Sequence, residues 1–329
     1  MESAAKAAIV GMQPEPLAAK ASGSGRHVAI LMGTFNGERH LQEQLDSLAA
    51  QTHTDWSLWV SDDGSADRTL DLVQAFACRF SPGKVQCIQG PRLGFAANFM
   101  SLLARPDLRG NYFAFCDQDD VWLPHRLAVT LEALASVHPH SPALACGRTE
   151  YMDEHGQPMG ESRPAPANCS FEVALAQNFC GGNTMLINGP ARSLLTAIPV
   201  ATVSAHDWLA FLLVAGAGGS VLFSDRTLVR YRQHGGNSLG ENQSLKARLS
   251  RLGELMAGEF KRRTSLNVEA LRVSLPQLTP HNQSVFECFE QGRTAPAVLR
   301  GQHLARSGVR RLGMAENWAY RLAYALGRI

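Results

Sequence analysis

Three aspartates stand directly after an apolar run, in the stretch FAFCDQDDVW at 113–122. At the end of a buried strand, Asp117, Asp119 and Asp120 would repel one another unless a cation held them together. Carboxylate oxygens are the ligands that Mg²⁺ and Mn²⁺ prefer, and such an ion takes its other ligands from phosphates and water. The spacing therefore predicts a divalent-metal site at the end of a strand. The alternative interpretation is a solvated acidic turn.

Strands and helices alternate from His27 onward, and this order would position the aspartates. The stretches HVAILMGTFN, SLWVSDDGS, KVQCIQ and NYFAFC are predicted strands, and apolar residues at helical spacing predict helices between them. Such alternation is typical of an α/β fold with a doubly wound, mostly parallel sheet flanked by helices. Ligands collect outside the carboxyl ends of such strands, where the turns TFN, DDGS and DQDD fall.

Some boundaries are predicted from single residues. Ser65 is expected to cap the helix that carries Val73, and Pro124 is expected in the first turn of a later helix. The stretch GGNTMLIN is a predicted strand. The apolar run from Trp208 to Phe223 is slightly short for a membrane span, so we expect a buried helix followed by a buried strand.

Composition excludes several classes of protein. The chain of 329 residues has a formal net charge of only +2, whereas nucleic-acid-binding domains usually carry a strong basic excess. The seven cysteines are scattered and form no CxxC pair. We therefore expect reduced, buried thiols in a cytosolic protein, and neither a zinc site nor a disulfide framework. Residues 1–26 do not read as a secretory signal and are expected to form a disordered leader.

The motifs in this order resemble family 2 glycosyltransferases, which have the GT-A fold. The resemblance rests on GTFNGERHLQEQLDSLAAQTHTDWSLWVSDDGSADRT, RLGFAANF and FCDQDDVWLPHRL. It continues through HDW at 206–208 and RQHGGNSLG at 232–240, which resemble the bacterial rhamnosyltransferase branch. Each motif is short, and the signal lies in their order and spacing.

The resemblance also implies a division of the chain. It covers residues 27–240 as a GT-A domain, in which 27–123 would be the nucleotide-sugar-binding half and 124–240 the acceptor half. The remaining residues, 241–329, read as a helical, basic C-terminal extension.

On the donor side, the resemblance implies a sugar linked to dTDP or UDP. The residues that it assigns to the donor are Thr34, Asn36, Asp62, Asp63, Arg92, Gly94, Asn98, Asp117, Gln118 and Arg232. Of the DDGS turn, Asp63 is the preferred contact to the base, since a carboxylate can accept a ring N–H from uracil or thymine. The guanidinium of Arg232 would hold phosphate oxygens in its fork.

The metal and the catalytic base also follow from the resemblance. Asp117 and Asp119 fall on the family's metal-binding signature, and His234 would bind phosphate or the metal. The ion would offset the charge that grows on the leaving nucleoside diphosphate. Asp207 falls where the family keeps the base that takes the proton of the acceptor hydroxyl in an inverting transfer. Its alternative is a carboxylate that complements a helix dipole.

On the acceptor side, CGGNTMLIN resembles the family's acceptor-side strand, where glycines let a sugar approach the backbone closely. The expected acceptor contacts are Gly182, Asn183, Thr184 and Trp208. Many family members have Glu before the catalytic Asp, whereas this chain has His206, as the rhamnosyltransferase-like branch often does. A strand with a glycine bulge is the alternative reading of this segment.

Three other classes of protein fit part of the pattern. DQDDV matches an aspartyl-nucleophile phosphatase with Asp117 as the nucleophile. That class needs a later lysine and a later acidic pair; the only lysines after Asp120 are Lys246 and Lys261, and no Asp-Asp pair follows. A nucleotidyltransferase would carry a glycine-rich, basic loop after the first strand, which GTFNGERH does not provide. A non-catalytic, sugar-binding relative stays open.

The expected function is therefore an inverting, metal-dependent hexosyl transfer, with dTDP-rhamnose as the leading donor and a cell-surface polysaccharide or lipid-linked glycan as acceptor. We expect a cytoplasmic protein that works at the inner face of the membrane. The C-terminal stretch would contact anionic lipid or pack on the core; its residues are Arg310, Arg311, Trp318, Tyr320, Arg321 and Tyr324. The sequence names neither the linkage position nor the oligomeric state.

Overall fold

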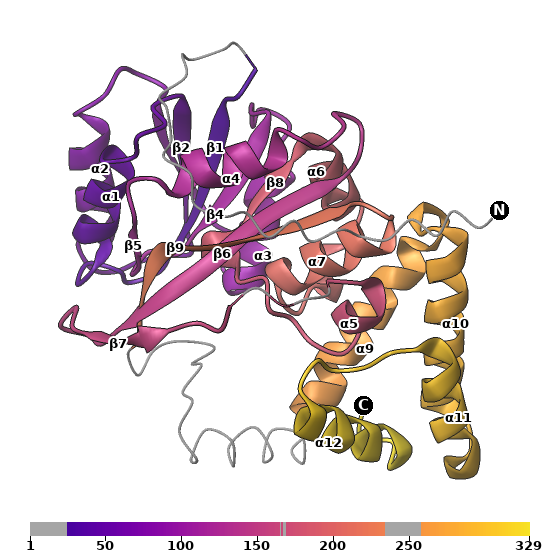
Figure 1. The fold of residues 1–329 in the computed structure, drawn as a ribbon. Helices are drawn as coiled ribbons and strands as arrows, with labels where there is room; N and C mark the ends of the chain where they lie inside the picture. Colours follow the sequence, from indigo (N-terminus) through magenta and orange to yellow (C-terminus); the bar gives the residue numbers. More distant parts are fainter. Residues whose placement is uncertain (1–24, 165, 167–168, 234–257) are drawn as a thin grey trace.

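A nine-stranded sheet forms the centre of the computed structural model, which describes residues 25–164, 166, 169–233 and 258–329 (Figure 1). The sheet order begins with β3 (Val85–Gln89), β2 (Trp56–Asp62), β1 (Val28–Thr34) and β4 (Tyr112–Cys116). It continues through β8 (Leu186–Asn188), β6 (Ala143–Met152), β9 (Ser220–Arg232) and β5 (Val121–Trp122). β7 (Pro158–Glu161) pairs with β6 beside this path.

The direction of the strands changes after β4. β1 is parallel to both β2 and β4, and β2 is parallel to β3. β8 is antiparallel to β4 and to β6, whereas β9 is parallel to β6 and antiparallel to β5. The predicted α/β fold with a mostly parallel sheet and flanking helices is confirmed, with a mixed second half.

Alternate side chains of the parallel strands enter two different cores, as the two-residue repeat of a strand requires. Val28, Ile30 and Met32 of β1 belong to one core, and Ala29 and Leu31 belong to the other. The helices that cover the first core are α1 (Leu41–Ala49), α2 (Thr69–Ala77) and α4 (Arg126–Leu134). Those that cover the second are α3 (Phe95–Leu103), α6 (Gly189–Thr196) and α7 (His206–Gly216).

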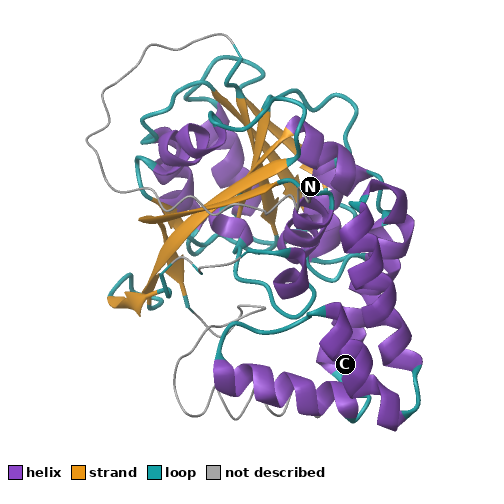
Figure 2. Cartoon of the chain, turned by 45° about the vertical axis from the view of Figure 1, so that its right-hand side comes forward, coloured by secondary structure: helices purple, strands orange, loops and turns teal. Residues whose placement is uncertain are grey.

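The C-terminal helices extend the second core, and Figure 2 shows them gathered to one side of the sheet. They are α9 (Glu259–Val273), α10 (Pro280–Thr294), α11 (Ala297–Ser307) and α12 (Met314–Ala325). Leu271 of α9 and Phe286 of α10 share this core with Leu212 of α7. The shorter elements are α5 (Phe171–Ala174) and 3₁₀ turns at Gly182–Thr184, Val200–Thr202 and Leu275–Gln277. Within the described ranges, every helix is too short or too polar to cross a membrane.

Two predicted helix starts are wrong. Ser65 does not cap α2, because its hydroxyl donates to the Asp62 carboxylate at 2.6 Å and the helix begins only at Thr69. Pro124 precedes α4 instead of entering its first turn, since His125 is the N-cap residue. In both cases the loop before the helix is longer than expected.

Two further expectations differ from the structure. The GGNT part of the predicted strand forms the 3₁₀ turn Gly182–Thr184, and β8 begins only at Leu186. Among the cysteines, which are free, Cys78 and Cys87 are exposed, whereas all had been expected to be buried. The predicted leader at 1–26 lies outside the described residues except for 25 and 26, and the predicted domain boundaries at 123 and 240 stay predictions.

The turn between α7 and β9 generates a prediction for Gly219. A methyl group there would collide with the carbonyl oxygen of Pro142 and lie 2.9 Å from that of Val214. We expect Gly219→Ala to lower the free energy of unfolding by about 2 kcal/mol, because backbone atoms cannot yield to an overpacked methyl. Chemical denaturation measures this. The matched control is Gly189→Ala, where a methyl meets nothing within 4 Å; equal losses in the two variants would contradict the packing argument.

Candidate active site

The turns after β1, β2 and β4 are joined to one another by hydrogen bonds. The amide of Gln118 brackets Phe35: its Oε1 accepts from the Phe35 N–H at 2.9 Å, and its Nε2 donates to the Phe35 carbonyl at 3.0 Å. The Asn36 N–H donates to Ser65 Oγ at 2.8 Å, and Asn36 Oδ1 accepts from the Ala66 N–H at 2.9 Å. The three polar turns predicted from the strand ends therefore meet at one edge.

Asp62 holds the turn after β2 in shape. Its buried carboxylate accepts from Thr34 Oγ1 at 2.9 Å and from the N–H groups of Gly64 and Ser65 at 3.1 and 2.8 Å. A carboxylate that accepts several such bonds is an anchor for the surrounding backbone. Thr34 and Asp62, both predicted donor contacts, lie together as a buried pair.

Asp63 reaches instead to the loop before α3. Its two carboxylate oxygens accept from the N–H groups of Arg92 at 2.7 Å and Gly94 at 3.1 Å. Arg92 and Gly94 both have positive φ, at 58° and 87°, so this loop has a conformation that the Asp63 carboxylate helps to fix. Asp63, Arg92 and Gly94, which were predicted separately, are thus one hydrogen-bonded unit.

Asn98 lies on α3, the helix that follows this loop, and its side chain is buried. Its Nδ2 donates to the Ser61 carbonyl at 2.9 Å, while its Oδ1 has no hydrogen-bond partner among the described residues. A methyl group at Gly90 would lie 3.0 Å from Asn98 Oδ1 and 2.5 Å from Asp63 Oδ1. Only glycine fits between these two polar groups, so Gly90 belongs to the site although it was not predicted. The signal for it was the Gly-Pro pair directly after β3.

The acidic turn after β4 divides into a buried and a half-buried part. Asp120 is fully buried, and its carboxylate accepts from Asn183 Nδ2 at 2.9 Å and from the Arg232 N–H at 3.2 Å. Burial, with the charges of Asp119 and Asp117, raises the pKa of Asp120 well above its ordinary value. Asp120 therefore ties the turn to two distant segments, and Asp117 and Asp119 remain at the rim.

The carboxylate of Asp117 lies close enough to those of Asp119 and Asp207 to feel their charges. Its withdrawal from water, then Asp119, then Asp207 raise its pKa to about 7, and Arg126 opposes them. Such mutual repulsion is what a divalent cation relieves, so this donor set fits a metal. Within the described ranges, no group of three or more His, Cys, Asp or Glu side chains could hold an ion. A metal would thus take at most two such ligands there; His234 lies outside those ranges.

Asp207 sits in the first turn of α7, against the Gly182–Thr184 turn. Its Oδ1 accepts from the Trp208 N–H at 2.7 Å, and its Oδ2 accepts from the Gly182 N–H at 3.3 Å. The Asn183 carbonyl accepts from Arg126 Nη2 at 2.8 Å. This turn therefore links the predicted base, Asp207, to the acidic turn at Asp120, which Asn183 also contacts. Arg126 was missed because a cation inside an amphipathic helix pattern normally indicates a solvated face.

The ring of His206, the residue before Asp207, packs against two phenylalanine rings. Its ring centroid lies 4.3 Å from that of Phe99 and 4.5 Å from that of Phe115. Burial lowers the pKa of His206, which keeps the ring neutral. Neither ring nitrogen has a hydrogen-bond partner among the described residues.

Three of the predicted contacts are buried in the structure. Arg232 does not offer an open fork: it is buried, and its guanidinium donates to the carbonyls of Asp119 at 3.0 Å and Glu154 at 3.2 Å. Trp208 and Thr184 are also buried, with the Trp208 indole N–H donating to the Ala174 carbonyl at 2.7 Å. Their expected contacts to donor and acceptor stay predictions.

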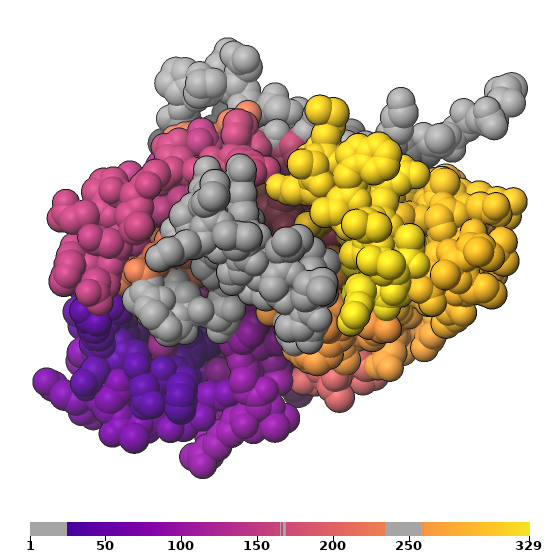
Figure 3. All heavy atoms as spheres, turned by 90° about the horizontal axis from the view of Figure 1, so that it is seen from below, coloured from indigo at the N-terminus to yellow at the C-terminus, as the bar shows by residue number. Residues whose placement is uncertain are grey.

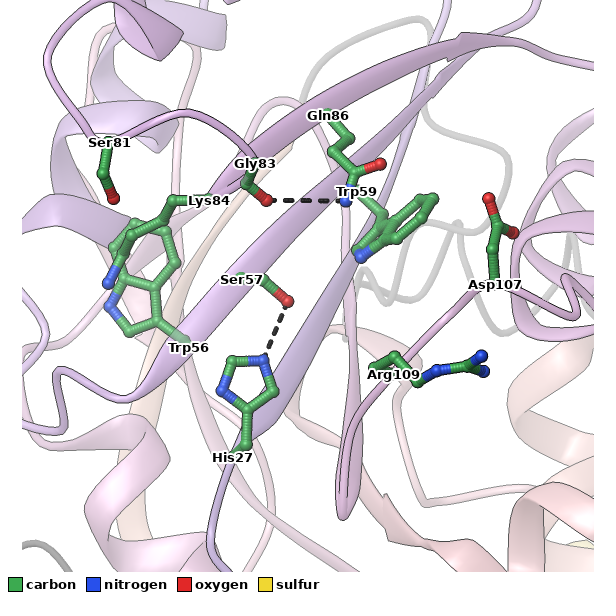
Figure 4. A pocket seen from close by; sticks show the side chains of 10 residues that line it. All are labelled: His27, Trp56, Ser57, Trp59, Ser81, Gly83, Lys84, Gln86, Asp107 and Arg109. Carbon is green, nitrogen blue, oxygen red and sulfur yellow. Dashed lines mark hydrogen bonds between the residues drawn. The ribbon is translucent and has the colours of Figure 1, made fainter. Parts of the chain in front are cut away.

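A hollow of about 370 Å³ lies away from these turns, near the amino ends of β1 and β2 (Figure 4). His27 and Ser57 are among its lining residues, and the His27 ring nitrogens lie 3.0 Å from Ser57 Oγ and 2.7 Å from an Asp55 oxygen. These contacts join the starts of the two strands. Because the carboxyl ends carry the acidic turn, this hollow is separate from the candidate active site.

Comparisons with known proteins identify the class. Residues 29–182 match the family model described as glycosyl transferase family 2. The chain is 27% identical over 237 residues to dTDP-rhamnosyl transferase RfbG of Shigella flexneri, covering 68% of this chain and 78% of that protein. It is 23% identical over 264 residues to the uncharacterized glycosyltransferase RT0329 of Rickettsia typhi, covering 76% of each.

The fold agrees with this class. A mannosyltransferase from Pyrobaculum calidifontis, solved in complex with GDP-Man and Mn²⁺, superposes with a TM-score of 0.50 at 17% identity, covering 95% of this chain and 90% of that one. This likeness concerns the fold alone, which is GT-A. The chain carries a family 2 glycosyltransferase domain over residues 29–182 and is a glycosyltransferase.

The Asp63 unit generates a prediction about local order. We expect Asp63→Ala to raise the amide exchange rates of Arg92 and Gly94 about tenfold, since each loses a charge-assisted hydrogen bond. Hydrogen–deuterium exchange read by mass spectrometry measures this. Asp71→Ala, a change at an exposed aspartate of α2, is the matched control. Unchanged exchange at 90–94 in the first variant would show that Asp63 does not fix the loop.

Proposed function

We propose that the protein is an inverting, metal-dependent glycosyltransferase that moves a sugar from a nucleoside diphosphate to a glycan acceptor. The observation that carries this proposal is that the Asp207 carboxylate, held against the Gly182–Thr184 turn, lies near the Asp117 carboxylate of the acidic turn. Asp207 acts on the pKa of Asp117 and accepts from the Gly182 N–H. A base beside the acceptor turn and an acidic rim beside the donor turns are what an in-line displacement needs.

In the proposed reaction, the acceptor hydroxyl gives its proton to the Asp207 carboxylate while its oxygen forms a bond to the anomeric carbon. The bond from that carbon to the phosphate oxygen breaks on the opposite face, and the nucleoside diphosphate leaves with the electron pair. Asp63 would contact the base of the nucleotide. Asp117 and Asp119 would hold Mg²⁺ or Mn²⁺, which when bound offsets the charge of the leaving diphosphate.

The protein's own residues would keep this geometry in place. Gln118 holds the acidic turn to Phe35 at the end of β1, which keeps the proposed metal site and the proposed nucleotide pocket in register. Gly182 and Asn183 would line the acceptor side, and the space that a side chain at Gly182 would take is filled by the His206 ring. The His206 ring packs between Phe99 and Phe115 next to the proposed base and would help to hold the start of α7 in position.

For the donor we propose dTDP-rhamnose, with a UDP-linked sugar as the second candidate. The relative from Shigella flexneri, named a dTDP-rhamnosyl transferase, supports this choice by matching 78% of its own length. We propose a cell-surface polysaccharide or a lipid-linked glycan as acceptor, at the inner face of the cytoplasmic membrane. A donor panel tests the proposal: dTDP-rhamnose with Mn²⁺ should raise the melting temperature most, because a ligand that binds the native state stabilises it. A panel without any stabilising sugar nucleotide would overturn it.

The proposed base generates a prediction. We expect Asp207→Asn to lower kcat at least about a thousandfold, since the amide cannot take the proton of the acceptor hydroxyl. The donor affinity, measured by calorimetry, should change less than about threefold, because Asn keeps an oxygen for the Gly182 N–H. Turnover is followed by release of nucleoside diphosphate. A variant with wild-type turnover would exclude Asp207 as the base.

The proposed metal site generates a prediction about donor binding. We expect Asp119→Ala to weaken Mn²⁺-dependent donor binding at least about tenfold, because one of two carboxylate ligands is lost. Donor titrations with Mn²⁺ and with a chelator separate the metal-dependent part of the affinity. Asp71→Ala again serves as control. If Asp119→Ala retains the full difference between the two titrations, the metal is held elsewhere.

A further inference from the structure

One face of α12, continued by Leu326 directly after it, is apolar and exposed to solvent. Met314, Trp318, Leu322 and Leu326 follow one another at intervals of four residues, with exposed fractions of 86, 75, 63 and 64%. Residues four apart lie on the same side of a helix, so these side chains form one stripe. We call these four residues the α12 stripe. A contiguous apolar surface of this kind normally marks an interaction site.

The opposite face of α12 is anchored, so the exposure of the stripe is a fixed feature of the fold. Tyr320 and Tyr324 are buried, and the Tyr324 hydroxyl donates to the Phe289 carbonyl of α10 at 2.5 Å. Before the helix, Arg311 Nε donates to the Ala176 carbonyl at 3.2 Å. Of the aromatic residues in this segment, the two tyrosines are therefore buried in the core, whereas Trp318 is exposed at the surface.

The C-terminal segment that contains the stripe is strongly positive in sequence. Residues 297–329 contain six arginines and one acidic residue, Glu316, which gives a net charge of +5. The whole chain has a net charge of +2, so the rest of the molecule is negative. The Arg321 guanidinium lies 6.0 Å from the Trp318 ring, directly beside the stripe. Figure 3 shows α12 at the surface of the molecule.

An anionic lipid bilayer fits both properties of this face. An apolar stripe can enter the acyl region while flanking arginines bind lipid phosphates, and tryptophan favours the interface between the two. A second copy of the chain fits less well, because pairing stripe with stripe would bring two strongly positive surfaces together. The length of α12, twelve residues, suits a helix that lies in the interface and does not span the membrane.

We propose that the α12 stripe inserts into the surface of an anionic membrane, with Arg321 beside it and the exposed Arg310 and Arg328 in the segments that flank α12. The inference deepens the proposed function in one respect: a lipid-linked acceptor would lie in the same membrane. The binding itself requires neither donor nor turnover, so it can be tested separately.

The test uses the full chain and sedimentation with lipid vesicles. The wild type should bind vesicles that contain phosphatidylglycerol and should bind pure phosphatidylcholine vesicles at least about tenfold more weakly, since each basic residue near an anionic surface contributes about 1 kcal/mol. The double variant Trp318→Ser, Leu322→Ser should lose at least about tenfold in affinity for the anionic vesicles. Wild-type protein that ignores anionic vesicles would overturn the proposal.

Matched controls separate the stripe from general hydrophobicity. The variant Leu70→Ser, Met159→Ser removes two exposed apolar side chains on other elements and should bind vesicles as the wild type does. Equal losses in both double variants would contradict a specific role of α12. Circular dichroism shows whether each variant is folded. Analytical ultracentrifugation without lipid shows whether the chain self-associates. Self-association that the stripe variant abolishes would identify a second copy of the chain as the occupant and would also overturn the proposal.

The role of the arginines near the stripe is tested separately, by the salt dependence of vesicle binding. Arg310→Gln combined with Arg321→Gln should weaken binding to anionic vesicles about tenfold and flatten its salt dependence. Donor affinity, measured by calorimetry in the absence of lipid, should be unchanged in every α12 variant. Failure of the donor assay would therefore count against the proposed function and failure of the vesicle assay against the membrane contact.

Discussion

The buried carboxylate of Asp120 is the constraint on which the arrangement of the site depends. It accepts hydrogen bonds from Asn183 and from the backbone of Arg232, which lie 63 and 112 residues further along the chain. A buried carboxylate without partners is very costly, so these bonds hold the acidic turn, the Gly182–Thr184 turn and the end of β9 in one arrangement. Asp117 and Asp119 at the rim take their positions from that junction.

Two buried arginines complete this junction through the backbone. Arg126 donates to the carbonyls of Asn183, Phe115 and Met185, and Arg232 donates to the carbonyl of Asp119. Because these guanidinium groups donate to carbonyl oxygens, they fix the path of the chain around the acidic turn. Asp117 and Asp119, at the rim of this turn, are the ligands of the proposed metal site.

Much of this arrangement could be predicted from the sequence because it follows from strand ends. Alternating strands and helices put the turns at Asn36, Asp63 and Asp117 on one edge, and their contacts follow from that topology. The burial of Arg232 and Trp208 could not be predicted, since the contacts that bury them come from the turn after β4 and from α5, which are distant in sequence. The helix start at Ser65 failed for a local reason: the serine hydroxyl found the Asp62 carboxylate first.

The long reach of the Asp120 contacts limits how the protein can be divided. The segment that matches the family model ends at residue 182, and both partners of Asp120, with Asp207, come after it. An excised piece that stopped there would contain the acidic turn but would leave its central carboxylate without a donor. The recognisable signature of the family is thus shorter than the smallest piece able to assemble the site.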